Sequence, residues 1–181
     1  IGSHACKLLA KRGYCPVVVD NLSNGTRNAV KWGPLETVSL NDSQALSNVF
    51  RNYQPAAVMH FAGSIEVAES VLDPGKYYSN NVGGSLALLS IMVANRCPHL
   101  VFSSSAATFG APVIESIDEN HPQKPINPYG SSKLMVEQIA RDFSLSHGIR
   151  YMFLRYFNAA GADTDCEIGE NHHPESHLIP I

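Results

Sequence analysis

The sequence carries little charge of either sign and has no long hydrophobic run. Only 16% of its 181 residues are charged, the formal net charge is −3, and no block of like charges occurs. Nucleic-acid-binding surfaces and basic membrane-surface helices need such blocks, so the sequence predicts neither partner. The longest apolar stretch, residues 86–94, is far shorter than the roughly 20 residues that span a bilayer.

Glycine, proline and cysteine are also sparse. The chain has 13 glycines and 11 prolines, too few for a collagen-like or low-complexity protein. Its first residues lack the charged start and the apolar core of a signal peptide. The cysteines lie far apart and form no Cys-x-x-Cys motif, which predicts reduced thiols in a cytoplasmic protein. They are Cys6, Cys15, Cys97 and Cys166.

Hydrophobic residues make up 44% of the chain, enough for one domain with a sizeable core. Continuous apolar runs alternate with stretches of helical periodicity. We predict strands at residues 16–19, 36–40, 56–61, 99–103 and 150–156. We predict helices at residues 3–12, around 45–50, at 76–95 and at 129–146. This pattern is typical of a parallel sheet covered on both faces, so the predicted fold is a doubly wound α/β sheet of the Rossmann type.

The carboxyl ends of the strands are the first candidate sites, because ligands of such sheets bind beyond them. Asp20 ends the strand at 16–19 and is suited to hold ribose hydroxyls, although an aspartate there is also common in an ordinary turn. Ala62 and Gly63 follow the strand at 56–61 and would let a ligand approach the backbone closely.

Tyr129 and Lys133 are four residues apart in a predicted helix, so they share one face of it. A phenol has a pKa near 10 and is a poor base at neutral pH, and lowering that pKa by about three units takes roughly 4 kcal/mol. An adjacent lysine and a cationic nicotinamide ring could supply this energy. Together with Ser105, which follows the strand at 99–103, the pair predicts an acid–base site for a hydroxyl being oxidised.

Longer motifs accompany these three residues over essentially the whole chain. They are DNLSNG at 20–25, HFAG at 60–63, NNV at 80–82, SSSA at 103–106, NPYGSSKLMVEQ at 127–138, RYFN at 155–158 and HLIP at 177–180. With Ser105, Tyr129 and Lys133, these motifs resemble the extended short-chain dehydrogenase/reductase family, and within it the UDP-glucose 4-epimerases.

The resemblance implies an NAD-dependent isomerase that inverts C4 of a UDP-sugar and interconverts UDP-galactose and UDP-glucose in galactose metabolism. Tyr129 would take the proton from the 4-hydroxyl, Lys133 would lower the Tyr129 pKa and bind the nicotinamide ribose, and Ser105 would help relay the proton. The residues that it implies for NAD binding are Ile1, Gly2, Asp20, Asn21, Leu22, Ser23, Asn24, Gly25, Leu40, Phe61, Ala62, Gly63, Ser64, Ile65, Asn81, Ser103, Tyr129, Lys133 and Phe157. Those for the UDP-sugar are Ser105, Tyr129, Asn158, His177 and Leu178. It also implies a homodimer through the helices at 76–95 and 129–146.

The resemblance also bears on the two ends of the chain. Gly2 resembles the last glycine of a Gly-x-Gly-x-x-Gly fingerprint, so we expect the first strand and two earlier glycines to be missing. Residues 1–160 would form an NAD-binding domain without its first strand, and residues 161–181 would begin a substrate-binding region. We therefore expect this chain alone to bind NAD weakly and to turn over little.

Three positions depart from the family pattern. Ser39, before Leu40, stands where an acidic residue usually contacts adenine. Ile65 stands where some members have a lysine, and Phe109 replaces a common tyrosine whose hydroxyl has no assigned role.

Other functions remain open. Related dehydratases have an Asp-Glu pair where this chain has Ala106 and Ala107, so elimination is not expected. A 4-epimerase of an N-acetylated or uronic UDP-sugar is one alternative, and a non-catalytic NAD-binding fragment is another.

Histidines and glycines also need an interpretation. His60 lies in an apolar run and is expected to be a hydrogen-bonded core residue, and Gly83 and Gly84 predict close helix packing. The histidines near the end of the chain could suggest zinc, but Pro174 interrupts any helix there, so we expect no metal. They are His172, His173 and His177.

Overall fold

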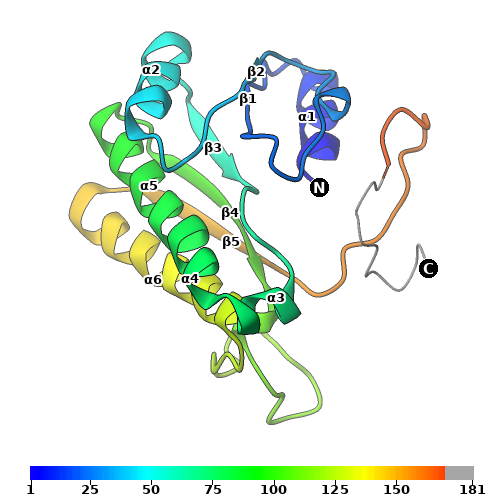
Figure 1. Cartoon of the computed structure of the whole chain (residues 1–181), viewed down its shortest axis with the longest axis vertical. Helices are drawn as coiled ribbons and strands as arrows, with labels where there is room; N and C mark the ends of the chain where they lie inside the picture. Colours follow the sequence, from blue (N-terminus) through cyan, green and yellow to red (C-terminus); the bar gives the residue numbers. More distant parts are fainter. Residues whose placement is uncertain (170–181) are drawn as a thin grey trace. The chain divides into compact units, whose positions relative to one another are not determined.

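Parallel strands joined by helices make up the described part of the chain, residues 1–169 of the computed structural model (Figure 1). This is the Rossmann-type α/β fold predicted from the sequence. The strands form two parallel sheets, and the chain divides into two compact units. Unit 1 comprises Ile1–Val38 and the residues from Asn158 onward, and unit 2 comprises Ser39–Phe157.

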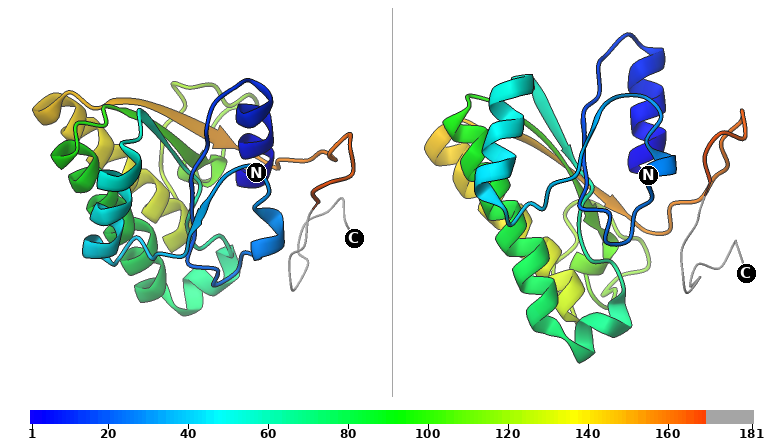
Figure 2. Two further views of the ribbon diagram at one scale, coloured as in Figure 1. Left: turned by 90° about the horizontal axis from the view of Figure 1, so that it is seen from above. Right: turned by 45° about the horizontal axis from the view of Figure 1, so that its top comes forward.

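Unit 2 contains a three-stranded sheet in the order β3-β4-β5, and α2, α5 and α6 cover one of its faces (Figure 2). The strands are β3 (Ala57–His60), β4 (His99–Ser105) and β5 (Arg150–Tyr156). The long helices are α2 (Ser43–Tyr53), α5 (Gly84–Ala94) and α6 (Pro128–His147). The shorter elements are α3 (Val67–Leu72), α4 (Pro74–Tyr77), a π-helix (Tyr78–Gly83) and a 3₁₀ turn (Ala106–Thr108).

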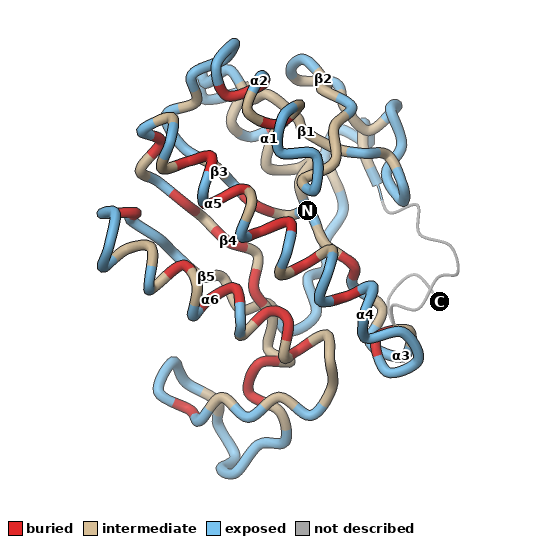
Figure 3. Tube along the Cα trace, turned by 60° about the vertical axis from the view of Figure 1, so that its left-hand side comes forward, coloured by how far each residue is buried: buried red, intermediate tan, exposed pale blue. Residues whose placement is uncertain are grey.

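The core of unit 2 lies between its sheet and these helices, where Figure 3 shows many of the buried positions. Phe102, in the middle strand, is 1% exposed and lies in register with His60 of β3 and Phe153 of β5. Leu89 of α5 and Val136 of α6 are each 1% exposed. The helix that follows β4 is therefore held firmly against the sheet, which matters because its first turns carry the proposed acid–base residues.

The single helix predicted at 76–95 is interrupted. The chain there runs through α4, the π-helix and α5. A π-helix accommodates an extra residue and often occurs at functional sites, and here it contains Asn81. A Cβ placed on Gly84 would lie 3.1 Å from the Cβ of Leu40, so close packing explains this glycine, as predicted.

Unit 1 contains the short parallel pair β1 (Val18–Val19) and β2 (Leu35–Glu36), with α1 (Gly2–Lys11) and a 3₁₀ turn (Arg27–Ala29). The strand predicted at 36–40 was wrong in extent. The N–H of Val38 donates to the carbonyl of Glu36 at 3.0 Å, so a tight turn ends β2 after Glu36.

Candidate active site

In unit 2, the carboxyl end of β4 meets the start of α6 and brings Ser105 and Tyr129 together. Ser105 is the last residue of β4 and hydrogen-bonds the side chain of Tyr129. Asn127 caps α6 by accepting the N–H of Gly130 at 2.8 Å. Gly130 lies so close to the Ala107 carbonyl that it has no room for a side chain. The sequence thus places Tyr129 directly beside the end of β4.

Lys133 lies one turn further along α6 and is buried, with 3% of its surface exposed. Its Nζ donates to the carbonyl of Ser103 at 2.9 Å and lies 5.0 Å from the centre of the Phe102 ring. Burial lowers the pKa of Lys133 to about 8. The lysine is therefore placed beside the strand end by a backbone carbonyl, with an aromatic ring beneath its charge.

Burial and Ser105 act in opposite directions on the pKa of Tyr129 in this chain. Burial raises its pKa above the usual value, and the hydrogen bond from Ser105 lowers it by a smaller amount. Lys133 Nζ lies 5.8 Å from the centre of the Tyr129 ring. The ring also packs edge-on against the fully buried Tyr77, at 6.4 Å between centroids. The chain positions the phenol well, but a further positive charge is needed to make it a base.

Asn81 joins the loop after β3 to α6. Its Oδ1 accepts the N–H of Ser64 at 2.7 Å, and its Nδ2 donates to the Ser64 carbonyl and to the Ser132 hydroxyl, each at 3.1 Å. Asn81 was assigned to NAD binding from the resemblance. In this structure its side chain is fully used in holding Ser64 and Ser132.

Gly63, which has no side chain, lies beside Lys133. A Cβ placed on Gly63 would lie 3.1 Å from Asn81 Oδ1 and 3.6 Å from Lys133 Nζ. A side chain there would press against Asn81 Oδ1 and contact the lysine ammonium, whereas glycine lets the backbone lie against both. These residues therefore fit a ribose or phosphate-bearing cofactor that passes the end of β3.

His60 is a hydrogen-bonded core residue, as predicted. It is 5% exposed, and its Nε2 lies 2.8 Å from the hydroxyl of Ser85, which donates to the Asn81 carbonyl. Because that hydroxyl proton is already used, Nε2 carries the proton of His60. Burial, and then the charge of Lys133, lower the pKa of His60 to about 3, so it stays neutral.

A buried polar network behind the site was not singled out from the sequence. The carboxylate of Glu137, in α6, accepts hydrogen bonds from Ser104 of β4 and Arg155 of β5. The only signal in the sequence is the spacing, since Glu137 follows Lys133 by four residues and therefore shares its helix face.

The other assigned residues of unit 2 differ in exposure. Ile65 and Phe157 are 44% and 63% exposed, whereas Leu40 is partly buried against the position of Gly84. Phe109 is buried, with the Arg155 guanidinium 5.3 Å from its ring centre.

In unit 1, the carboxylate of Asp20 is used in its own loop. Its Oδ1 accepts the N–H of Leu22 at 2.7 Å, and Asn21 Oδ1 accepts the N–H of Ser23 at 3.0 Å. These bonds form an ordinary turn, which was the alternative interpretation of Asp20 from the sequence. A Cβ on Gly25 would lie 3.2 Å from the Asp20 carboxylate, so glycine leaves this carboxylate room in the loop.

The remaining assigned residues of unit 1 lie at the start of α1, in the loop after β1 and after β5. Ile1 precedes α1 and accepts the N–H of Ala5 at 3.0 Å, and Gly2 is the first residue of the helix. Asn24 and Asn158 are exposed. His172, His173, His177 and Leu178 lie outside the described residues.

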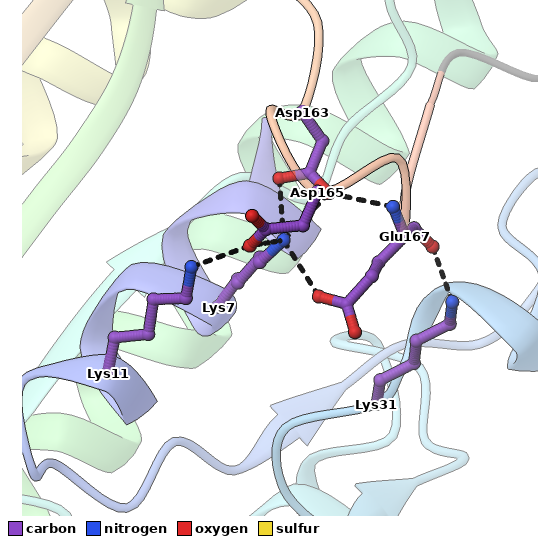
Figure 4. Close-up of polar contacts among 6 residues, drawn as sticks. All are labelled: Lys7, Lys11, Lys31, Asp163, Asp165 and Glu167. Atoms are coloured by element: carbon purple, nitrogen blue, oxygen red, sulfur yellow. Dashed lines mark hydrogen bonds and ion pairs between the residues drawn. The ribbon is translucent and has the colours of Figure 1, made fainter.

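A cluster of three acidic residues in unit 1 surrounds Lys7 (Figure 4). Lys7 Nζ lies 2.7 Å from Asp163, 2.8 Å from Asp165 and 2.8 Å from Glu167. Lys11 also contacts Asp165, at 2.7 Å. The carboxylates have the spacing of a metal site, but the Lys7 ammonium supplies the positive charge between them.

Comparison with known proteins identifies the family. The sequence pattern of the NAD dependent epimerase/dehydratase family matches residues 1–181. The chain belongs to this family. Among curated members, UDP-glucose 4-epimerase of Rhizobium meliloti (strain 1021) is 52% identical over 181 residues. UDP-arabinose 4-epimerase 1 of Arabidopsis thaliana is 42% identical, over 97% of this chain and 44% of its own length.

The structure is also similar to that of solved family members. UDP-glucose 4-epimerase from Brucella ovis, in complex with NAD, matches 99% of this chain with a TM-score of 0.97 and 51% identity. The chain spans about half of these proteins, 55% of the Rhizobium and of the Brucella chain.

Two further expectations concern the whole chain. All four cysteines are free thiols in the structure, as predicted. Among residues 1–169, no helix has the length and apolar character that crossing a membrane requires.

Proposed function

We propose that the protein containing this chain interconverts UDP-galactose and UDP-glucose by inversion at C4, using NAD. The observation that carries the proposal is the contact of Ser105 with Tyr129 at the end of β4, with Lys133 buried one turn away. Family membership and the NAD complex of the Brucella relative support the choice of cofactor.

The acid–base work in this proposal belongs to Tyr129. Its phenol takes the proton of the sugar 4-hydroxyl as hydride leaves C4, and returns the proton when hydride is delivered to the opposite face. Ser105 hydrogen-bonds the reacting oxygen and passes the proton between that oxygen and Tyr129. Because the proton and the hydride both return to the sugar, the reaction involves no net oxidation.

Lys133 holds a positive charge beside this site. At a pKa of about 8 it is mostly protonated at neutral pH, so it can bind ribose hydroxyls and favour the phenolate. When bound, NAD supplies a reversible hydride acceptor and a cationic ring, which is the further charge that Tyr129 needs. Gly63 lies beside Lys133, and its lack of a side chain would let such a cofactor approach the backbone at the end of β3 closely.

The test is an assay of the complete protein with UDP-galactose, with UDP-glucose measured by a coupled dehydrogenase. We expect conversion, and protein-bound NAD in the purified enzyme. Intact protein that holds NAD and converts none of the substrate would overturn the proposal. The same assay on the 181-residue chain alone tests the expectation that it binds NAD weakly and turns over little.

A second candidate is 4-epimerisation of another UDP-sugar. It is favoured by the Arabidopsis relative, named a UDP-arabinose 4-epimerase, at 42% identity. A panel of UDP-galactose, UDP-N-acetylgalactosamine, UDP-galacturonate and UDP-xylose distinguishes the candidates by the ratio of their kcat/KM values. A chain that neither contains nor acquires NAD would favour the third alternative, a non-catalytic fragment.

A cytoplasmic location and a homodimer are also proposed. The four free thiols support the location. The homodimer is supported by apolar side chains that are exposed on the two helices expected to form the interface. Leu86 of α5 is 44% exposed, and Met135 of α6 is 46% exposed.

A further inference from the structure

The three consecutive serines that end β4 each have a hydrogen bond to α6. The Ser103 carbonyl accepts Lys133 Nζ at 2.9 Å. The Ser104 hydroxyl donates to Glu137 Oε1 at 2.6 Å, and Ser105 bonds Tyr129. The three partners are spaced by four residues, so they lie along one face of the helix. Two of these bonds belong to the acid–base site, and the third is made by a residue that does no chemistry.

Glu137 is the most heavily bonded side chain of this face. It is fully buried, and Arg155 of β5 donates hydrogen bonds to both its oxygens, from Nε to Oε1 at 2.9 Å and from NH2 to Oε2 at 2.7 Å. Gln123 and Arg141 donate to Oε2 at 3.2 and 3.0 Å. With Ser104, five hydrogen bonds reach one carboxylate, which saturates its acceptor capacity.

The carboxylate is charged in the folded chain. Burial raises the pKa of Glu137, but the hydrogen bonds from Arg155, Ser104 and Gln123 outweigh burial and hold the pKa below its usual value. Glu137 therefore joins α6 to β4, β5 and the loop before α6 through bonds to a fixed charge, which are about twice as strong as bonds between neutral groups.

We propose that Glu137 is a positioning residue of the active site, which fixes α6 along β4 so that the hydroxyls of Tyr129 and Ser105 stay in contact. This inference rests on the proposed function. Without the Glu137–Ser104 bond, Lys133 and Tyr129 are the residues of α6 that still bond the serines ending β4, and small displacements along the strand lengthen the Ser105–Tyr129 contact. Misplacement of reacting groups by about 1 Å can cost roughly 100-fold in rate.

The substitution Glu137→Gln tests the proposal, because it keeps the shape and removes the charge. We expect kcat at pH 7 to fall roughly 10- to 100-fold, with KM for the UDP-sugar and bound NAD unchanged. Because the Ser105 bond lowers the pKa of Tyr129, its loss moves the kcat–pH profile to higher pH. Gln138→Ala is the matched control, since Gln138 is the next residue of α6 and is exposed, where it bonds only Asp142.

If Glu137→Gln fails to fold, the double variant E137M/R155M replaces the buried pair by apolar groups, which proteins often tolerate without loss of stability. The same drop in kcat and the same shift of the pH profile are expected. A folded variant with the kcat and pH profile of the wild type overturns the proposal. A loss of activity that only matches the loss of folded protein, with an unchanged pH profile of kcat, also overturns the proposal, because a purely structural role predicts that result.

A readout without turnover separates this inference from the proposed function. Titration of ¹³C-labelled tyrosines by NMR, with the Tyr129 signal assigned by Tyr129→Phe, should give a higher Tyr129 pKa in Glu137→Gln than in the wild type. An unchanged Tyr129 pKa overturns the positioning role even in an active enzyme. A wild type that is inactive on every UDP-sugar overturns the proposed function, while the NMR titration still decides the role of Glu137.

Discussion

Lys133 and Tyr129 lie in a part of unit 2 where charge is costly, and burial moves both toward their neutral forms. It lowers the pKa of Lys133 to about 8 and raises that of Tyr129. The spacing of the two residues is readable from the sequence, because residues four apart share a helix face. Their ionisation cannot be predicted from the sequence, because it depends on burial by β4 and by Tyr77, which lie far away in the chain.

The pKa of Lys133 predicts how stability depends on pH. Between its folded pKa of about 8 and the ordinary value of 10.5, the unfolded chain keeps a proton that the folded chain has lost, so stability rises with pH. From pH 7 to pH 10, we expect the free energy of unfolding of the wild type to rise relative to Lys133→Met, by at most about 3 kcal/mol. Urea unfolding at several pH values measures this. A constant difference between the two proteins would show that Lys133 is not desolvated.

Ser105 makes a separate prediction for activity. Removing its hydroxyl in Ser105→Ala takes away the bond that lowers the pKa of Tyr129, together with a proton relay. We expect kcat at pH 7 to fall roughly 100-fold and to recover partly at higher pH. Steady-state kinetics from pH 6 to pH 9 measure this. Ser90→Ala, on the exposed side of α5, should leave the profile unchanged, and a profile unchanged in Ser105→Ala would exclude the proposed relay.

Individual elements differ in how well they could be predicted. β5 has the predicted bounds, and α6 extends beyond them by one residue at each end. Both have strong local signals, a continuous apolar run in one and helical periodicity with a capping Asn127 in the other. The π-helix was missed because hydrophobic periodicity does not reveal an extra residue in a turn. The short α3 was not predicted at all.

The start of α6 depends on a close contact with the turn after β4. A Cβ on Gly130 would collide with the Ala107 carbonyl and lie 3.1 Å from the Cβ of Pro125. Gly130→Ala should therefore destabilise the protein by about 3 kcal/mol and reduce activity in the fraction that folds. Thermal unfolding and kcat of the folded fraction measure these effects.

Gly148→Ala is the control at the other end of α6. Gly148 has a φ of 72° with open space around it, so alanine there should cost only about 1 kcal/mol and leave kcat unchanged. Equal losses at the two glycines would show that crowding at Ala107 has no energetic weight.

At the scale of the whole molecule, the described chain comprises two compact units, and unit 1 joins the residues before Ser39 with those after Phe157. Residue patterns cannot show this, because the link from α1 to the 161–169 segment is made by long-range ion pairs of Lys7. The division into an NAD-binding domain and a substrate-binding region stays a prediction.

The Lys7 cluster predicts how unit 1 holds together. In Lys7→Met, three carboxylates lose their common cation, so we expect amide hydrogen exchange at 161–169 to become several-fold faster while exchange in α6 is unchanged. Lys11→Met is the control, because the Lys11 side chain is 57% exposed and contacts only Asp165 of the three. Contacts with Lys11 and then Lys7 lower the pKa of Asp165 to about 2. Once exchange rates are corrected for the intrinsic pH dependence of amide exchange, the protection factors at 161–169 in the wild type should therefore also fall as the pH falls from about 4 toward 2. Protection that is the same in Lys7→Met would exclude this role.

Because of the π-helix, a change in chain length can move Asn81 away from its partners without moving α5. Each residue of a helix turns the chain by about 100°, so deleting one residue between Asn81 and α5 would shorten the π-helix while leaving the buried face of α5 in place. The same deletion would rotate Asn81 away from Ser64 and Ser132, the two residues that it holds. The packing of α5 thus does not require the extra residue of the π-helix. Among relatives, we expect this residue to be present where the Asn81 contacts are kept, and not wherever the fold is kept.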